Sequence, residues 1–261
     1  MFVVSPEEFE RKRPLFERYF NTGYCSFQQF CDAVSWSEVE LFEKDPTSVL
    51  VDYKVVFDKT DMLRAKMALW NWVSGRLKDR RMSYFEFGVR AGVSMRWVSG
   101  ANADPASRFY GFDTFTGLPD GWVPAWGTRG ASAGYKAGDM AVSEIPSFGD
   151  ERVKLYPGLF QDTLFKAIDE ISLEAPIDPR VRADDHVLVI NNDGDTYTAA
   201  LFTLTTMFRY LRKGDILYFD EFFDTLNEFA AFNDFARSFY FRDRVKLLGR
   251  AYDACVFEVI R

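Results

Sequence analysis

The chain ends in VKLLGRAYDACVFEVI, residues 245–260, and this stretch indicates how its sheet is built. Two apolar runs, Val245–Leu248 and Ala254–Ile260, are separated only by Gly249–Asp253. Parallel strands need a crossover of a dozen or more residues between them, so these two runs must pair as an antiparallel hairpin.

Upstream of the hairpin, five further apolar runs alternate with segments of helical character. They are Tyr84–Phe87, Phe109–Phe112, Val153–Tyr156, Val187–Ile190 and Ile216–Phe219. Strands that alternate with helices are typical of βαβ units and a parallel sheet. We therefore predict an α/β fold of the Rossmann-like, doubly wound kind, with a mostly parallel seven-stranded sheet that ends in the antiparallel hairpin.

The chain divides into two predicted regions. Residues 1–60 lack the alternation of strands and are predicted to form an N-terminal helical extension, whereas residues 61–261 form the α/β domain. A loose i, i+3, i+4 apolar stripe predicts a helix from Asp61 to Leu77. Residues 116–150 contain seven glycines and are predicted to be a long loop inside the α/β domain.

Composition excludes several classes of protein. With 48% hydrophobic and 27% charged residues the chain is an ordinary globular protein, and its net charge of −7 argues against a nucleic-acid partner. No apolar run is long enough to span a membrane, and the N-terminus does not read as a secretory signal. The three cysteines match no zinc or redox spacing, so we expect reduced thiols in a cytoplasmic protein.

Polar residues follow the predicted strands at their carboxyl ends. The segments are Glu86-Phe-Gly88-Val-Arg-Ala-Gly92, Asp113-Thr114-Phe115, Asp193-Gly-Asp195 and Asp220-Glu221. In an open α/β sheet, ligands bind outside the carboxyl ends of the strands. This edge is therefore the predicted site.

Each segment suits a particular ligand group. Gly88 and Gly92 would let backbone N–H groups approach an anion, and an acid such as Asp113 suits a ribose diol. The segment lacks the dinucleotide fingerprint, because Arg90 stands where its middle glycine should be. Plain turn chemistry for the glycines and a helix cap for Asp113 are the alternatives.

The acidic residues suggest a metal. Neighbouring strands lie ~4.8 Å apart, so carboxylates at adjoining tips can converge on one ion, and oxygen ligands alone suit Mg²⁺ or Ca²⁺ and not zinc. A solvated acidic rim is the alternative interpretation.

Together these motifs resemble class I S-adenosylmethionine-dependent methyltransferases, and more narrowly the macrocin O-methyltransferase (TylF-type) family. The resemblance covers about residues 62–261. The motifs that carry it are Glu86-x-Gly88-x-x-x-Gly92, Asp113-Thr-Phe-Thr-Gly117-Leu-Pro119, Gly158-Leu-Phe160-Gln-Asp162-Thr-Leu164, Asp193-Gly-Asp195-Thr-Tyr197 and Asp220-Glu221.

The resemblance implies a role for each motif. The methionine part of the cofactor would lie over Glu86, Gly88 and Gly92, and the ribose would bind Asp113. The adenosine would lie beside Thr114 and Phe115, with Gly158 and Phe160 flanking the adenine. Family members bind Mg²⁺ through carboxylates corresponding to Asp193, Asp220 and Glu221. This chain departs from the family at Thr198-Ala-Ala, where the family has Glu-Ser-Thr, and at Glu221, where it has aspartate.

The function implied is methylation of a hydroxyl on a small molecule, a sugar or natural product, with or without a divalent metal. Asp193 or Asp195 would be the base, or a bound metal ion would assist deprotonation. The single histidine, His186, precedes its strand at the far edge and is not expected to serve as the base. Alternatives are a methyltransferase-like binding or assembly module without methyl transfer and a nicotinamide-dependent oxidoreductase.

Two further expectations concern the surroundings of the site. The aromatic residues of the glycine-rich loop, Trp122, Trp126 and Tyr135, would either close over a ring-shaped acceptor or pin the loop to the body. The N-terminal extension would cover the active site or build a homodimer. Neither a nucleic acid nor a membrane is expected as a partner.

Overall fold

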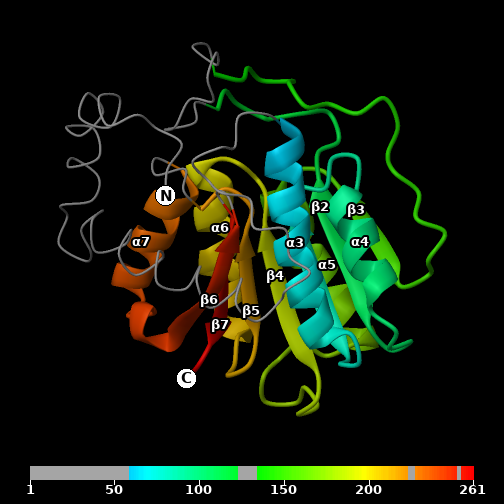
Figure 1. Ribbon diagram of the computed structural model, residues 1–261, viewed down its shortest axis with the longest axis vertical. Coiled ribbons are helices and arrows are strands. Elements are labelled where there is room, and N and C mark those ends of the chain that lie inside the picture. The colour runs from blue at the N-terminus through cyan, green and yellow to red at the C-terminus, as the bar shows by residue number, and fades with distance from the viewer. Residues whose placement is uncertain (1–58, 123–133, 223–226, 252–253) are drawn as a thin grey trace.

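The computed structural model describes residues 59–122, 134–222, 227–251 and 254–261 (Figure 1). Nearly all of the extension predicted for residues 1–60 lies outside these residues. The helix predicted from Asp61 to Leu77 is present as α3 (Lys59–Leu77).

All seven predicted strands are present, and the predicted fold class is confirmed. The strands are β1 (Met82–Phe87), β2 (Arg108–Asp113), β3 (Val153–Pro157), β4 (Val187–Asn192), β5 (Ile216–Phe219), β6 (Val245–Ala251) and β7 (Ala254–Val259). They form one sheet in the order β3-β2-β1-β4-β5-β7-β6. β1 to β5 are parallel, and β7 runs antiparallel to both β5 and β6, as the short Gly249–Asp253 connection required.

Helices cover both faces of the sheet, so the fold has three layers (Figure 1). α3 and α4 (Val93–Ala101) pack on one face, where their apolar residues meet side chains such as Tyr84 and Val189. The other face is covered by α5 (Phe160–Glu174), α6 (Tyr197–Met207) and α7 (Glu228–Ser238), which pack against Phe85 and Phe219. Short 3₁₀ turns lie at Phe208–Tyr210 and Arg242–Arg244.

Most phenylalanines of the described residues are buried in the core. Phe229, Phe232 and Phe235 project from α7 and are buried, and Phe232 stacks on Phe257 of β7 with ring centroids 5.2 Å apart. Alternate side chains of a central strand point to opposite faces, so every residue of β1 is buried. Among the described residues no helix is both long and apolar enough to cross a membrane.

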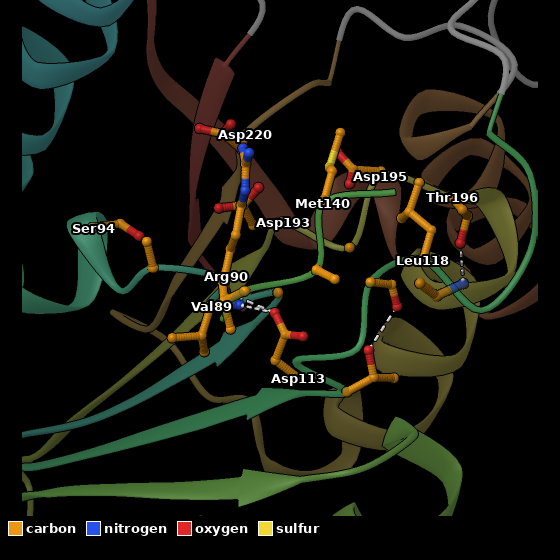
Figure 2. A pocket seen from close by; sticks show the side chains of 18 of the residues that line it. Val89, Arg90, Ser94, Asp113, Leu118, Met140, Asp193, Asp195, Thr196 and Asp220 are labelled. Atoms are coloured by element: carbon orange, nitrogen blue, oxygen red, sulfur yellow. Dashed lines mark hydrogen bonds between the residues drawn. The ribbon is translucent and has the colours of Figure 1, made fainter. Parts of the chain in front are cut away.

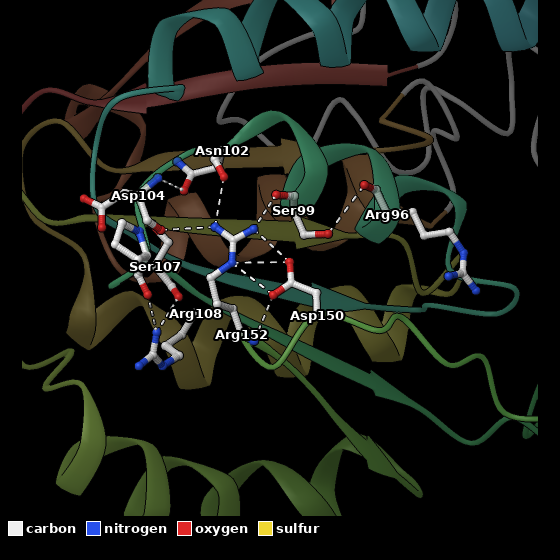
Figure 3. A network of polar contacts seen from close by, with 9 residues as sticks. Arg96, Ser99, Asn102, Asp104, Ser107, Arg108, Asp150 and Arg152 are labelled. Carbon is white, nitrogen blue, oxygen red and sulfur yellow. Dashed lines mark hydrogen bonds and ion pairs between the residues drawn. The ribbon is translucent and has the colours of Figure 1, made fainter.

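One arginine anchors the far end of α4 (Figure 3). Arg152 donates from Nη1 to the carbonyls of Asn102 and Asp104 and from Nη2 to the carbonyl of Ser99, and it pairs with Asp150 at 2.8 Å. The last carbonyls of a helix lack helical partners and carry partial negative charge, so a cation stabilises them. Because this end of α4 is held, its opposite end has a defined place at the carboxyl edge.

Candidate active site

The register of the parallel strands brings the predicted segments together. Phe87 aligns with Phe112 on one side and with Asn192 on the other, and Asn192 aligns with Phe219. The residue after each of these is a predicted site residue: Gly88, Asp113, Asp193 and Asp220. Side chains scattered over more than one hundred residues of sequence therefore lie in one row.

A cavity of about 1070 Å³ lies over this row. Its walls come from the turn after β1, the tips of β2, β4 and β5, the start of α5, and residues of α3 and α4. Of the predicted site residues, those that line it are Gly88, Asp113, Thr114, Phe160, Asp193, Asp195, Asp220 and Glu221. Four others, Glu86, Gly92, Phe115 and Gly158, lie behind its wall and are not among its lining residues.

Close packing explains the glycine at position 88. Its φ is +99°, and a Cβ there would lie 1.7 Å from the carbonyl oxygen of Asp193. Its N–H donates to the carbonyl of Phe112 at 2.9 Å. Gly88 thus lets the turn after β1 press against the tip of β4, and its N–H serves the sheet. This is a structural use of the glycine that the sequence did not distinguish from anion binding.

Asp113 stabilises the turn after β1 by accepting hydrogen bonds from backbone N–H groups (Figure 2). Its Oδ2 accepts from the backbone N–H groups of Val89 at 2.8 Å and Arg90 at 2.7 Å, and its Oδ1 accepts from Phe115 N at 2.6 Å. Arg90 has a φ of 48°, in the left-handed region that glycine adopts more readily than other residues. The carboxylate therefore holds the turn in place, and its Oδ1, which accepts one hydrogen bond, keeps one acceptor site.

Glu86 is a fully buried carboxyl beneath this turn. It accepts hydrogen bonds from Tyr84 Oη and Ser94 Oγ, each at 2.7 Å. Burial raises the pKa of Glu86 from 4.5 to about 8, with Asp220 and Asp113 adding to the rise against the two hydrogen bonds. The side chain is therefore neutral at pH 7, and it ties the end of β1 to the first turn of α4.

The amino end of α4 faces the cavity. Gly92 precedes the helix with a φ of 71°, and no side chain among the described residues caps it. Ala91, Val93 and Ser94 line the cavity at this end. An uncapped helix N-terminus presents N–H groups and partial positive charge, which favour an anion. Arg90, also in the cavity wall, adds a full positive charge beside it (Figure 2).

Of the remaining residues predicted to bind the cofactor, some line the cavity and the others support its wall. Thr114 Oγ1 donates to the carbonyl of Gly117 at 2.7 Å, and Phe115 is buried in the core with a φ of 59°. Gly158 donates its N–H to the carbonyl of Asp113 at 2.9 Å. Phe160 begins α5 and meets Phe87 edge to face, with ring centroids 5.3 Å apart. Of these, Thr114 and Phe160 reach the cavity.

Asp193 and Asp195 both line the cavity after β4 (Figure 2). Burial raises the pKa of Asp193 well above its usual range, and the neighbouring Asp220, Asp195 and Glu86 raise it further. Asp195 has a φ of 60°, a conformation that aspartate tolerates better than most residues. The next residue, Thr196, caps α6 by accepting from the N–H of Ala199.

The predicted magnesium site does not fit this arrangement. Asp193, Asp220 and Glu221 do adjoin, but Lys66 Nζ lies 2.6 Å from Asp220 Oδ2 and 3.9 Å from Glu221 Oε1. An ammonium group thus occupies the space between the carboxylates where an ion would bind. In the described part of the chain, no group of three or more His, Cys, Asp or Glu side chains is arranged to hold a metal ion.

The structure also shows where His186 and two aromatic residues of the glycine-rich loop lie. His186 lies at the amino end of β4, bonded through Nε2 to Ser83 Oγ at 2.9 Å, far from the cavity as expected. Burial, with Arg81, Arg182 and Arg212 nearby, lowers its pKa to about 4. In the glycine-rich loop, Trp122 and Tyr135 stack on each other with centroids 4.9 Å apart and both line the cavity, whereas Trp126 lies outside the described residues.

Sequence reasoning missed the wall contributed by α3. Lys66, Met67 and Trp70 line the cavity, together with Trp97 of α4. A signal was present, because Lys66 stands on the same helical face as the buried Trp70, Val73 and Leu77, at i, i+4, i+7 and i+11. A lysine within an apolar face needs an anionic partner.

Comparison with known proteins agrees with this geometry. A family model described as a methyltransferase domain matches residues 85–222, more than half of the 261 residues. CalS11, a calicheamicin methyltransferase, superposes with a TM-score of 0.56 at 18% identity, covering 98% of this chain and 93% of its own. The O-methyltransferase NovP gives 0.50 at 20% identity, covering 76% and 81%. These two likenesses show the fold.

A search of curated proteins found no match. The family model spans the turn after β1, the tip of β2 and the acidic tips of β4 and β5, all of which contribute to the cavity wall. On this evidence the chain belongs to the methyltransferase domain family.

Proposed function

We propose that the protein is an S-adenosylmethionine-dependent O-methyltransferase that acts on a hydroxyl group of a small molecule, a sugar or natural product. One observation carries the proposal: a single cavity joins an uncapped helix N-terminus, a strand-end aspartate and a pair of half-buried acidic residues, Asp193 and Asp195. Membership of the methyltransferase family removes the reason to consider a nicotinamide-dependent oxidoreductase.

The cofactor fits the half of the cavity near β1 and β2. The amino end of α4 and Arg90 suit the carboxylate of its methionine part, since both favour an anion. Asp113, which keeps accepting capacity, suits the ribose hydroxyls, and the face of Phe160 suits the adenine. Binding sites for drug-sized ligands measure about 300–1,000 Å³, so a cavity of about 1070 Å³ has room for the cofactor and a small acceptor.

S-adenosylmethionine supplies an activated methyl group. Because the cofactor itself provides the leaving group, methyl transfer needs no acid from the protein. The protein then has to align the acceptor, exclude water and remove the hydroxyl proton. We assign proton removal to Asp193 or Asp195, the carboxylates that line the cavity after β4.

The acceptor half of the cavity is partly apolar. Met67 and Trp70 of α3 and Trp97 of α4, from one face of the sheet, and Phe202 of α6, from the other, line the cavity, and Trp97 is 37% exposed. Flat aromatic side chains suit a ring-shaped acceptor. CalS11 is a calicheamicin methyltransferase and NovP an O-methyltransferase, which supports the same class of substrate here. The narrower macrocin O-methyltransferase (TylF-type) assignment rests on the sequence motifs.

Ligand binding and methyl transfer test the proposal together. Calorimetric titration with S-adenosylmethionine, its demethylated product and NAD should give binding for the first two alone. Transfer of a labelled methyl group should then be assayed with nucleotide sugars and hydroxylated aromatic metabolites as acceptors. Asp193→Asn and Asp195→Asn should show which of the two carboxylates is the base. The variant that lacks the base should still bind the cofactor but should no longer transfer the methyl group. Asp169→Asn, on the exposed face of α5, is the matched control.

The outcomes distinguish the alternatives. Failure to bind either form of the cofactor would refute the assignment. Cofactor binding without transfer to any hydroxylated acceptor would favour a binding or assembly module. The proposed homodimer is tested separately, by the molar mass of the full chain in solution.

A further inference from the structure

The acidic cluster at the tips of β4 and β5 carries more carboxylates than the cavity wall displays. Asp193, Asp220 and Glu221 are joined by Glu228 at the start of α7, whose Oε2 accepts from the N–H of Glu221 at 3.1 Å. Glu228 is only 1% exposed. Carboxyl groups that adjoin one another away from water are stable only where protonation or a nearby positive charge neutralises them.

Lys66 supplies that charge from another part of the chain. Its Nζ lies 2.6 Å from Asp220 Oδ2 and 3.9 Å from Glu221 Oε1, and its side chain is only 10% exposed. Burial raises the pKa of Glu228 well above its usual range, as it does that of Asp193, and the Lys66 ammonium opposes the rise in both. One lysine thus acts on the whole cluster.

The position of Lys66 follows from helix and strand geometry. One helical turn further along α3, Trp70 stacks on Tyr218 of β5 with ring centroids 3.8 Å apart and planes at 16°. α3 ends at Leu77, just before β1 begins at Met82, so it runs opposite to the parallel strands. Going back four residues along the helix covers about 6 Å, and going forward two residues from Tyr218 to Asp220 covers about 6.6 Å. The stacked pair therefore sets Lys66 beside Asp220.

A divalent ion and this ammonium compete for the same place. Mg²⁺ binds carboxylate oxygens at about 2.0–2.1 Å in octahedral geometry. An ion bridging Asp220 and Glu221 would need the space between them that Lys66 Nζ occupies, 2.6 Å from Asp220 Oδ2 and 3.9 Å from Glu221 Oε1. Moving Lys66 away would leave a lysine without its partner in a wall that is largely closed to water. Lys66 is also covalently part of the chain, whereas a metal ion would be held by its ligands alone.

We propose that Lys66 is the resident cation of this site, held in the place of a divalent metal ion, and that the protein works without such an ion. The role of the cavity in methyl transfer rests on the proposed function. The identity of the cation does not, because it is tested by metal binding alone.

The test is a calorimetric titration of the full chain with MgCl₂ and MnCl₂, followed by thermal unfolding at rising metal concentration. The wild type should show no saturable binding. Lys66→Met keeps the length of the side chain and removes its charge, so it should bind one divalent ion at least about ten-fold more tightly than the wild type, with a Tm that rises with metal concentration. Lys154→Met is the control, since Lys154 pairs with Glu170 at 2.7 Å on the exposed surface, and it should gain no ion.

Two further measurements keep the result decisive. The double variant Lys66→Met/Asp220→Asn removes both charges of the pair, so it should fold even if Lys66→Met does not, and it should bind no ion. Saturable one-to-one metal binding by the wild type that Asp220→Asn abolishes would overturn the proposal. A folded Lys66→Met that gains no ion would overturn it too. Cofactor binding, measured in the same preparations, reports separately on the proposed function.

Discussion

The buried carboxyl of Glu86 makes the stability of the protein depend on pH in a direction that can be measured. In the folded chain its pKa is raised by burial to about 8, against an ordinary value of 4.5. Between these two pH values the folded carboxyl holds a proton that the unfolded chain has lost. Stability contributed by this group is therefore complete below pH 4.5 and is lost as the pH rises toward 8.

Glu86→Gln isolates this effect, because the amide copies the neutral acid between the Tyr84 and Ser94 hydroxyls. Each pH unit of difference in proton binding is worth about 1.4 kcal/mol, so between pH 5 and pH 8 the variant should gain about 3–4 kcal/mol of unfolding free energy relative to the wild type. Above pH 8 the difference should level off. Urea unfolding of both proteins at each pH unit measures it.

Glu170→Gln is the matched control for this series. Glu170 is exposed, and its hydrogen bond from Lys154 lowers its pKa, so it is ionised in both states above pH 5 and its substitution should give a difference that does not change with pH. Parallel pH profiles for the wild type and Glu86→Gln between pH 5 and pH 8 would show that Glu86 is ionised in the folded protein. That result would refute the reasoning.

Three other substitutions, the first with a control, test single features of the structure. Gly88→Ala places a Cβ 1.7 Å from the Asp193 carbonyl and should lower the unfolding free energy by roughly 3 kcal/mol or more, whereas Gly100→Ala, where nothing lies within 4 Å, should raise it by about 0.5–1 kcal/mol. Asp113→Asn leaves one backbone N–H facing an amide nitrogen and should cost about 1–3 kcal/mol in urea unfolding and weaken S-adenosylmethionine binding; unchanged affinity would remove Asp113 from the cofactor site. His186→Gln should leave the pH profile of methyl transfer unchanged. Because the folded pKa of this histidine is lowered to about 4, the wild type should lose about 3 kcal/mol of unfolding free energy as the pH falls from 6.5 to 4, and the variant should not show this loss.

The sequence by itself determined the fold class and the edge of the sheet at which the site lies. Its apolar runs are short and clearly bounded, and the brief Gly249–Asp253 connection admits only an antiparallel pair. The residue that follows each strand is readable from the sequence too, and in a parallel sheet all such residues meet at one edge. Gly88, Asp113, Asp193 and Asp220 were therefore predictable as neighbours.

Only the tertiary structure decided what each of these residues contacts. The aspartate expected to bind ribose also holds the turn after β1, and the glycine expected to bind an anion makes room for a carbonyl of β4. Lys66 lies 154 residues from Asp220 in the sequence, and no local pattern links the two. Their contact depends on the packing of α3 across β5 through Trp70 and Tyr218. The acidic residues that follow the strands can be read from local sequence patterns. The positive charge of Lys66 beside them comes from α3, which is distant in the sequence and is positioned by packing in the core.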